Sequence, residues 1–376
     1  MDEIQLSLII VAYNSGEALR LTLQSVRQAL SQITHEVIIV DNNSDPGTLL
    51  DLPETFSEMV WIKSEVNLGF GRACNLAAKR AKYPTLFFVN PDTICTEETF
   101  LGTYRFLHSK EDSGIVGCRI LNSDGTLQLA CRRSFPDVWS ALYRVVGLSA
   151  LFPKSRLFGK YNLTYLDPQE EAEVDAVSGS FFALRKEDFL QVQGFDPDFF
   201  MYGEDLDLCY RIQSLGKRNY YTPDASVIHL KGRSAATRRW RSLFNFYRAM
   251  EIFAKKHRNI TGAPLPLVKV GINGAFLLAL LRSIRFGAIT LVDLLLPLLL
   301  SGVAYRVFDA QILAFLPLFW PLVKVAALWA EKNSPFFLAQ RRRVIVLLPN
   351  MKEKGHWDLL DPQRDLMAVV AQEQTG

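Results

Sequence analysis

Two adjacent carboxylates, Glu204 and Asp205, follow the apolar run 199–202 and precede a helical pattern of leucines. A carboxylate beside apolar side chains is partly desolvated, which is how proteins keep a general base reactive. Acidic residues in a first helical turn are also favoured by the helix dipole, so the pair would equally mark an ordinary helix start. The pattern therefore predicts a helix beginning near Glu204, with an acid–base site as one of two interpretations. Arg211, further along that helix, fits either an ion pair within the helix or a substrate contact.

Strand and helix patterns alternate through the first hundred residues. Unbroken apolar runs are typical of buried parallel strands, and their alternation with helices predicts a doubly wound, mainly parallel α/β sheet. A β-rich run at 181–184 leads into a short helix near Lys186. The strands expected in the first hundred residues are 6–11, 37–40, 60–63 and 85–89, and the helices are 16–30 and 70–82.

Polar clusters follow three of these strands, at 13–15, 41–44 and 90–92. Each cluster alone would make an ordinary turn. Ligands of doubly wound sheets bind at the carboxyl ends of the strands, so the three together predict a ligand site along that edge. The loop 12–16 lacks the G-x-G-x-x-G sequence, which disfavours a nicotinamide or flavin enzyme. Acid and amide side chains at the strand ends still favour a nucleotide ligand.

Basic charge is concentrated in one segment, although the whole chain carries a net charge of only +3. Residues 1–230 carry 21 Lys and Arg against 30 Asp and Glu, whereas residues 231–260 carry nine basic side chains against Glu251 alone. This distribution suits an anionic ligand or an anionic membrane surface better than nucleic acid bound along the whole fold, so no nucleic-acid partner is expected.

The cysteines and the start of the chain indicate a compartment. The five cysteines are odd in number and form no C-x-x-C pair, which predicts buried free thiols in a reducing compartment rather than a metal site. The chain opens directly onto a strand pattern without a basic region, so no secretory signal is expected and the catalytic part is expected in the cytoplasm.

Seven motifs, in order along the chain, resemble those of the family 2 glycosyltransferases, and most closely their bacterial rhamnosyltransferase-like branch. The resemblance covers roughly residues 5–255 and implies a GT-A fold that binds a nucleoside-diphosphate sugar. It divides the chain into a GT-A domain at 1–260 and a helical, membrane-associated region at 261–376. The motifs are V-A-Y-N-S (11–15), V-D-N-N-S-D (40–45), N-L-G-F-G-R-A-C-N (67–75), F-V-N-P-D (88–92), V-S-G-S-F (177–181), G-F-D-P-D-F-F-M-Y-G-E-D-L-D-L-C-Y-R (194–211) and I-H-L-K-G-R-S (228–234).

The resemblance also implies roles for single residues. Asp205 matches the base of an inverting transfer, and it is preferred to Glu204 because the family's base is the second residue of that pair. Asp92 and His229 would hold Mg²⁺ or Mn²⁺, which stabilises a diphosphate leaving group; a structural histidine remains the alternative for His229. The implied nucleotide contacts are Tyr13, Asp41, Asn67, Gly69, Arg72, Asn75 and Asn90, and the implied phosphate or substrate contacts are Gly179, Glu204, Lys231 and Arg233.

Two apolar segments, 286–304 and 312–330, distinguish the last third of the chain. Each has nineteen residues, near the length that spans a bilayer, and a single charge, Asp293 or Lys324. Flanking basic residues fit the positive-inside rule, and the pattern at 231–258 predicts an amphipathic helix for a membrane surface. Attachment to the cytoplasmic side of the cell membrane is therefore expected, with Asp293 and Lys324 paired if the segments form a hairpin. A soluble helical appendage that packs on the catalytic domain or on a second subunit is the alternative.

These features predict a membrane-associated inverting glycosyltransferase. By the branch resemblance it would move L-rhamnose from dTDP-L-rhamnose onto a lipid-linked saccharide in the biosynthesis of a cell-surface polysaccharide, such as cell wall or O-antigen. A UDP-hexose or UDP-N-acetylhexosamine transferase of the same fold is one alternative, and a catalytically inert membrane scaffold is another. A nucleotidyltransferase is disfavoured because the glycine-rich first loop is absent.

Overall fold

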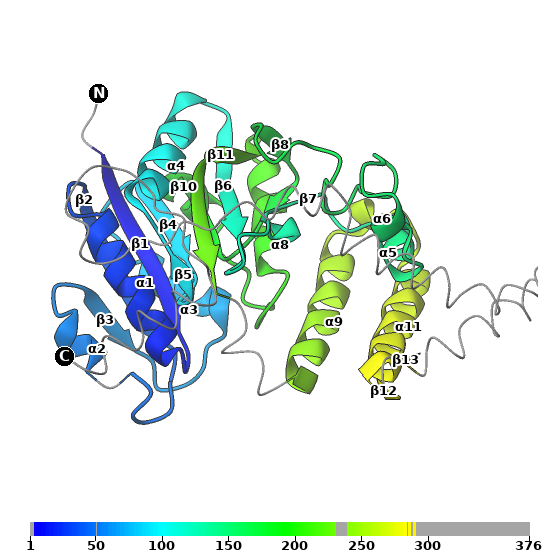
Figure 1. The fold of residues 1–376 in the computed structure, drawn as a ribbon, viewed down its shortest axis with the longest axis horizontal. Helices are drawn as coiled ribbons and strands as arrows, with labels where there is room; N and C mark the ends of the chain where they lie inside the picture. Colours follow the sequence, from blue (N-terminus) through cyan, green and yellow to red (C-terminus); the bar gives the residue numbers. More distant parts are fainter. Residues whose placement is uncertain (1–3, 50, 231–238, 284, 287–288, 291–376) are drawn as a thin grey trace, which may run out of the picture.

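A computed structural model describes residues 4–49, 51–230, 239–283, 285–286 and 289–290. A nine-stranded sheet with helices packed against it forms the α/β unit, and further helices stand beside that unit (Figure 1). The strands of the sheet are β1 (Gln5–Ala12), β2 (Thr34–Asp41), β3 (Val60–Lys63), β4 (Thr85–Val89), β5 (Thr93–Ile94), β6 (Ser113–Leu121), β8 (Ala172–Val174), β10 (Phe181–Arg185) and β11 (Arg218–His229).

The sheet is mixed and mostly parallel, in the order β3-β2-β1-β4-β10-β6-β11-β5, with β8 paired to β11. Strands β1 to β4 are mutually parallel, as the alternating pattern predicts. Strand β10 lies antiparallel between β4 and β6, and β11 runs parallel to β6. Because β10 enters from the opposite direction, the loop before it lies at the same edge as the carboxyl end of β4.

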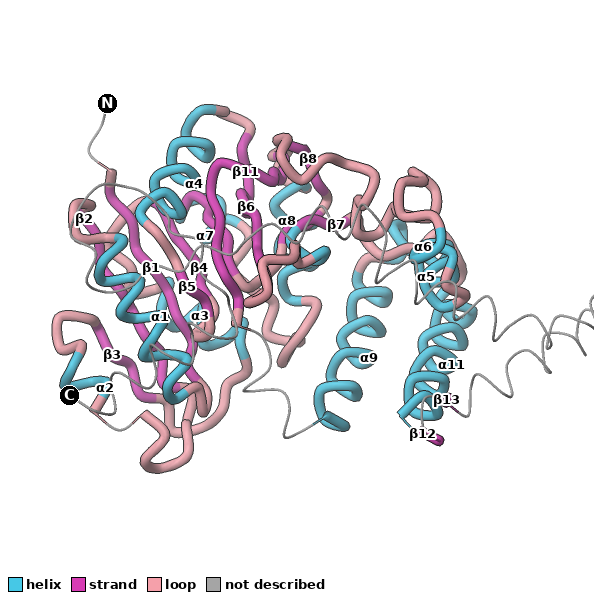
Figure 2. The backbone as a smooth tube through the Cα atoms, in the orientation of Figure 1, coloured by secondary structure: helices cyan, strands magenta, loops and turns pink. Residues whose placement is uncertain are grey.

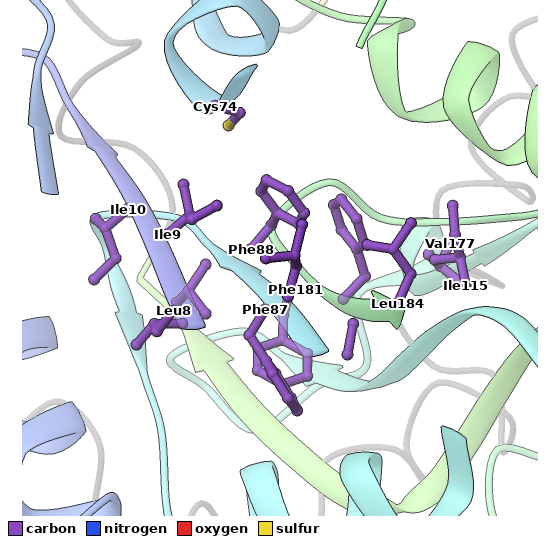
Figure 3. Packing of buried hydrophobic residues seen from close by; sticks show 14 of the residues in the cluster. Leu8, Ile9, Ile10, Cys74, Phe87, Phe88, Ile115, Val177, Phe181 and Leu184 are labelled. Atoms are coloured by element: carbon purple, nitrogen blue, oxygen red, sulfur yellow. The ribbon is translucent and has the colours of Figure 1, made fainter. Parts of the chain in front are cut away.

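Buried aromatic side chains hold the centre of the sheet against helices on both faces. Phe87 and Phe88 are neighbours on β4 and point to opposite faces, because successive side chains of a strand alternate (Figure 3). The ring of Phe87 lies 5.4 Å from that of Phe100 on α4, whereas Phe88 lies 5.4 Å from Phe195 in the loop before α8. The helices that cover the sheet are α1 (Gly16–Ala29), α3 (Phe70–Ala78), α4 (Glu97–Ser109), α7 (Lys186–Gln191) and α8 (Glu204–Gln213), with a short α2 (Leu52–Thr55).

Helices outside the sheet lie together at one end of the molecule (Figure 2). Helix α9 packs against α11, where the Tyr247 hydroxyl donates a hydrogen bond to the carbonyl oxygen of Ala275 (3.0 Å). Among the described residues, no helix has both the length and the apolar character needed to cross a membrane. The elements in this part are α5 (Val138–Val145), α6 (Leu148–Leu151), α9 (Arg239–Lys256), α10 (Arg258–Thr261) and α11 (Leu265–Ser283), with β7 (Arg132–Arg133), β9 (Ala176–Val177) and a 3₁₀ turn at Leu129–Cys131 between them and the sheet.

The apolar segments predicted at 286–304 and 312–330 lie almost wholly outside the described residues, as do Asp293 and Lys324. At the start of the first segment, β12 (Arg285–Phe286) pairs antiparallel with β13 (Ile289–Thr290). The prediction of a helix is therefore wrong for these first residues, because Phe286 and Ile289 are paired in a short antiparallel β-ladder. The five cysteines are free and buried, as predicted.

Candidate active site

Hydrogen bonds connect the loops that follow β1, β2 and β3. Asn14 and Asp45 exchange two of them, from Asn14 Nδ2 to Asp45 Oδ2 (2.8 Å) and from the Asp45 amide to Asn14 Oδ1 (2.7 Å). Asn42 is buried and donates from Nδ2 to Asn67 Oδ1 (3.1 Å). These bonds hold the loops after β1, β2 and β3 together at one edge of the sheet. The predicted nucleotide contacts at this edge are Tyr13, Asp41, Asn67 and Gly69.

Arg72 and Asn75, predicted as nucleotide contacts, bond to the backbone of the loop that leads to Glu204. Asn75 donates to the carbonyl oxygen of Phe195 (2.7 Å) and accepts from its amide (2.8 Å). The Arg72 guanidinium donates to the carbonyl oxygen of Pro197 (2.8 and 3.0 Å). Both side chains therefore fix the loop, and Arg72 also lines a cavity of about 430 Å³ between this loop and α9.

Asn90, Asp92 and His229 form a second group, at the carboxyl end of β4 and the end of β11. His229 Nε2 lies 3.0 Å from Asp92 Oδ1 and 3.5 Å from Asn90 Nδ2. Gln128 Nε2 donates to the His229 carbonyl oxygen (3.3 Å), so Gln128 Oε1 is the atom that faces His229 Nδ1 at 3.1 Å. Since Oε1 only accepts, Nδ1 carries a proton, and in the neutral tautomer the lone pair of Nε2 would face the Asp92 carboxylate.

If Nε2 of His229 and Oδ1 of Asp92 both act as acceptors, a cation or a proton must lie between them, since they are 3.0 Å apart. A divalent metal ion would meet this requirement. Ligands about 2.1 Å from an octahedral ion and at right angles to each other lie about 3 Å apart, as Asp92 Oδ1 and His229 Nε2 do. No cluster of three or more His, Cys, Asp or Glu suited to a metal occurs within the described parts of the chain. Mg²⁺ commonly takes one or two protein ligands and completes its shell with phosphate and water. The pair fits that arrangement.

Asp205 lies at the start of α8 and is held by residues distant in sequence. Its Oδ2 accepts hydrogen bonds from Arg133 Nη2 (2.5 Å) and from the amide of Gly179 (3.0 Å). Its Oδ1 accepts only the amide of Leu206 (2.8 Å) among the described residues, which leaves a lone pair on Oδ1. Burial lowers the Arg133 pKa, but the charge and hydrogen bond of Asp205, together with Tyr161 and Cys209, leave that pKa raised. The ion pair with Arg133 therefore fixes the orientation of the Asp205 side chain.

Glu204 differs from its neighbour because its buried carboxyl group forms no ion pair with any of the described residues. Burial and the negative charge of Asp205 raise the pKa of Glu204 to about 8. Its Oε2 has no hydrogen-bond partner among the described residues. The raised pKa therefore favours the protonated form of Glu204 at neutral pH.

The loop before β10 contacts both Asp205 and the end of β4 that leads to Asp92. The amide of Asn90 donates to the carbonyl oxygen of Ser180 (2.9 Å), one residue from the Gly179 amide that binds Asp205. Arg211 forms an ion pair with Asp207 (2.7 Å) and donates to the carbonyl oxygens of Val192 (2.6 Å) and Gly194 (2.7 Å), so its side chain ties α8 to the segment after α7. Lys231 and Arg233 lie outside the described residues.

Arg133 and Gln128 are site residues that the sequence patterns did not indicate. Arg133 stands 72 positions before Asp205 and contacts it only because β7 pairs with β9 beside the start of α8. Gln128 stands 101 positions before His229. No local motif marks either residue, since their partners are set by the tertiary fold.

Gly69→Ala is expected to lower the free energy of unfolding by about 2–4 kcal/mol. Gly69 has a φ of +80°, and an added Cβ would lie 2.3 Å from the carbonyl oxygen of Phe200. Gly47→Ala is the matched control, because Gly47 has a φ of +82° and no atom within 4 Å of an added Cβ. Urea unfolding should show a loss of about 1 kcal/mol for the control. Equal losses in the two variants would show that the contact with Phe200 is absent.

Glu204→Gln should change how stability depends on pH. Between the ordinary pKa of 4.5 and the raised pKa of about 8, the folded wild type binds more protons than the unfolded chain, so its stability falls as pH rises. Relative to the wild type, the variant should therefore gain stability from pH 5 to pH 9, on the order of 3 kcal/mol. Glu187→Gln, at an exposed glutamate, should show no such trend in urea unfolding across this range. A pH-independent difference for Glu204→Gln would mean that Glu204 is ionised in the fold.

Comparison with known proteins agrees with the motifs. Residues 7–192 match the family model "Glycosyl transferase family 2", and residues 164–231 match "N-terminal domain of galactosyltransferase". The chain is 27% identical over 231 residues to "Rhamnosyltransferase WbbL" of Escherichia coli (strain K12), which covers 59% of this chain and 82% of the relative. It is also 27% identical over 272 residues to "N-acetylglucosaminyl-diphospho-decaprenol L-rhamnosyltransferase" of Mycobacterium tuberculosis, covering 69% of this chain and 87% of the relative.

Solved structures resemble the chain only distantly. The structure of GalNAc-T7 with UDP, GalNAc and Mn²⁺ has a TM-score of 0.49 at 14% identity and covers 73% of this chain and 54% of that one. The mannosyltransferase PcManGT from Pyrobaculum calidifontis, with GDP-Man and Mn²⁺, has a TM-score of 0.47 at 16% identity and covers 88% of each chain. At these values the ligands of those proteins identify neither the donor nor the metal of this chain.

Proposed function

Because residues 7–192 form a glycosyl transferase family 2 domain, the chain is a glycosyltransferase of that family, and we propose that it transfers L-rhamnose from dTDP-L-rhamnose to a lipid-linked saccharide. The names of the two rhamnosyltransferase relatives support the sugar, and the diphospho-decaprenol acceptor named for the second relative supports a lipid-linked acceptor. In this proposal the reaction belongs to cell-surface polysaccharide biosynthesis.

The observation that carries the proposal is the link between Asp205 and the Asp92–His229 pair. The segment Gly179–Ser180 bonds to Asp205 on one side and to the amide of Asn90 on the other. The proposed base and the loop that carries Asp92, half of the proposed metal pair, thus contact the same short segment. Sugar transfer with inversion needs this arrangement, because the acceptor hydroxyl and the departing diphosphate lie on opposite sides of one carbon.

In the proposed reaction, Asp205 Oδ1 accepts the proton of the acceptor hydroxyl through its remaining lone pair. The acceptor oxygen forms a bond to the anomeric carbon as the bond from that carbon to the diphosphate oxygen breaks, and the electron pair leaves with the diphosphate. Arg133 and the Gly179 amide keep the carboxylate oriented throughout. Asp92 and His229 would hold Mg²⁺ or Mn²⁺, which when bound neutralises charge on the diphosphate.

A panel of nucleotide sugars tests the donor assignment. The wild type should turn over dTDP-L-rhamnose, by transfer or by slow hydrolysis, faster than UDP-glucose or UDP-N-acetylglucosamine. A preference for a UDP sugar would assign the donor to the alternative of the same fold. If the chain consumed none of these donors with or without acceptor, a catalytically inert scaffold would replace the enzyme.

We also propose that the chain works at the cytoplasmic side of the cell membrane. The basic segment at 231–260 and the apolar segments at 286–304 and 312–330 support this from the sequence. Membrane fractionation of cells that express the full chain should recover it in the membrane pellet after a high-salt wash. Recovery in the supernatant at low salt would contradict the location.

A further inference from the structure

Helices α5 and α6 stand at one end of the molecule, beside the α/β unit (Figure 1), and α5 together with the segment after α6 carries an exposed apolar surface. We call it the α5–α6 surface and define it by Trp139, Leu142, Phe152 and Leu157. Their exposed fractions are 62%, 45%, 52% and 55%. Trp139 and Leu142 are three positions apart on α5 and therefore share one helix face. Large apolar side chains that gather at the surface in this way indicate an interaction site.

The α5–α6 surface is built on a fixed framework. The Asp137 side chain caps α5 through the amide of Ser140 (2.6 Å) and also pairs with Lys160 (2.6 Å). The ring of Phe158 lies 5.1 Å from Tyr143 and 5.7 Å from Phe152, so it joins α5 to the segment after α6. The exposed side chains thus project from a structure with its own internal contacts.

Charge in the same segment has one sign. Residues 138–160 contain Arg144, Lys154, Arg156 and Lys160 and no Asp or Glu. All four basic residues are exposed. Tryptophan and leucine flanked by arginine and lysine are the composition of segments that lie in the plane of an anionic membrane interface. A protein partner would not require that acidic residues be absent from the whole segment.

A row of apolar side chains on α11 lies close by. Leu267, Val270 and Leu277 are spaced along one helix face and are 59%, 68% and 54% exposed. Helix α11 contacts α5, and the side of α11 that carries Lys269 is turned to Glu251 of α9 (3.3 Å). The α11 row and the α5–α6 surface therefore belong to the same end of the molecule.

We infer that the α5–α6 surface docks in the interface of an anionic lipid bilayer, with the α11 row beside it. Trp139, Leu142, Phe152 and Leu157 enter the headgroup boundary, and Arg144, Lys154 and Arg156 contact lipid phosphates. The inference rests on the membrane location proposed above and extends it, since it assigns a membrane contact to α5 and to the segment after α6. Docking there would orient the catalytic domain relative to a lipid-linked acceptor.

A fluorophore at position 142 tests this contact in the full chain. The five native cysteines are buried, so Leu142→Cys provides an accessible thiol for an environment-sensitive label. Ser31→Cys, at an exposed position after α1, is the matched control. With vesicles of phosphatidylglycerol and phosphatidylcholine, the label at 142 should shift to the blue and be quenched by lipid-borne quenchers, whereas the label at 31 should not change. Phosphatidylcholine alone should give a weaker response.

Other outcomes separate this inference from the proposed location. If the protein sediments with the vesicles but the label at 142 does not respond, membrane binding occurs elsewhere and the inference fails. If the label is already blue-shifted without vesicles, another part of the chain or a second copy covers the surface, and the inference also fails. If the protein does not bind vesicles at all, both the inference and the membrane location fail.

A substitution pair gives an independent measurement. Trp139→Gln combined with Leu142→Gln should lower the vesicle partition coefficient by roughly tenfold or more, because two exposed apolar side chains no longer enter the interface. Leu190→Gln is the control, since Leu190 on α7 is 50% exposed and lies outside the surface. Equal partition of the pair and the control would overturn the inference. Donor hydrolysis should be unchanged in both variants, which would show that they remain folded.

Discussion

Asp205→Asn should lower the rate of sugar transfer by ~10²–10⁴-fold and leave donor affinity within a few-fold of the wild type. In the proposed reaction the carboxylate acts on the acceptor hydroxyl, so its loss would remove proton transfer without removing a contact to the nucleotide. Steady-state transfer assays and donor titration of the same preparation measure the two effects. Near-normal turnover would exclude Asp205 as the base.

The same substitution leaves the Arg133 guanidinium buried without its counter-charge. Removing one partner of a buried ion pair costs about 3–5 kcal/mol, so lost activity could arise from unfolding. The double variant Arg133→Met/Asp205→Asn separates the two causes because neither charge remains. It should recover much of the free energy of unfolding but none of the transfer. Recovery of transfer with stability would mean that Asp205 is only structural.

Asp92→Ala should weaken metal-dependent donor binding by at least about 10–100-fold, the range found when even outer-shell partners of metal ligands are removed. Asp92 supplies the carboxylate of the candidate metal pair, so His229→Ala, which removes a neutral ligand, should have the milder effect. Calorimetric titration of the donor with and without Mn²⁺ measures both.

Asp224→Ala is the control for this pair of variants. Asp224 is an exposed carboxylate on β11, the strand that carries His229, and its loss should leave metal-dependent binding unchanged. If donor binding to the wild type does not depend on metal, Asp92 and His229 are not a metal site, and their contact is an ion pair with protonated His229.

Local patterns in the sequence were sufficient for the first half of the fold. The strand predicted at 6–11 is β1 (Gln5–Ala12), and that predicted at 85–89 is β4 (Thr85–Val89). A short continuous apolar run that alternates with helical patterns is typical of a buried parallel strand. The helix predicted near Glu204 begins at that residue in α8 (Glu204–Gln213). In contrast, the antiparallel insertion of β10 between β4 and β6 depends on pairing between distant segments.

The candidate site divides in the same way. Asp205, Asp92 and His229 stand in motifs, and the structure places Asp92 and His229 3.0 Å apart. Their supporting residues, Arg133 and Gln128, have no motif because their contacts arise from the tertiary fold. Arg72 and Asn75 also stand in a motif, but the structure gives them backbone contacts in the loop before α8.

The most direct test is the product formed from dTDP-L-rhamnose and an N-acetylglucosaminyl-diphospho-polyprenol acceptor. The wild type should form a rhamnosylated lipid whose anomeric configuration, measured by NMR, is opposite to that of the donor, because one base and one displacement invert the anomeric carbon. The Asp205→Asn variant should form almost none of it. A product with retained configuration, or equal product from both proteins, would contradict an inverting transfer in which Asp205 is the base.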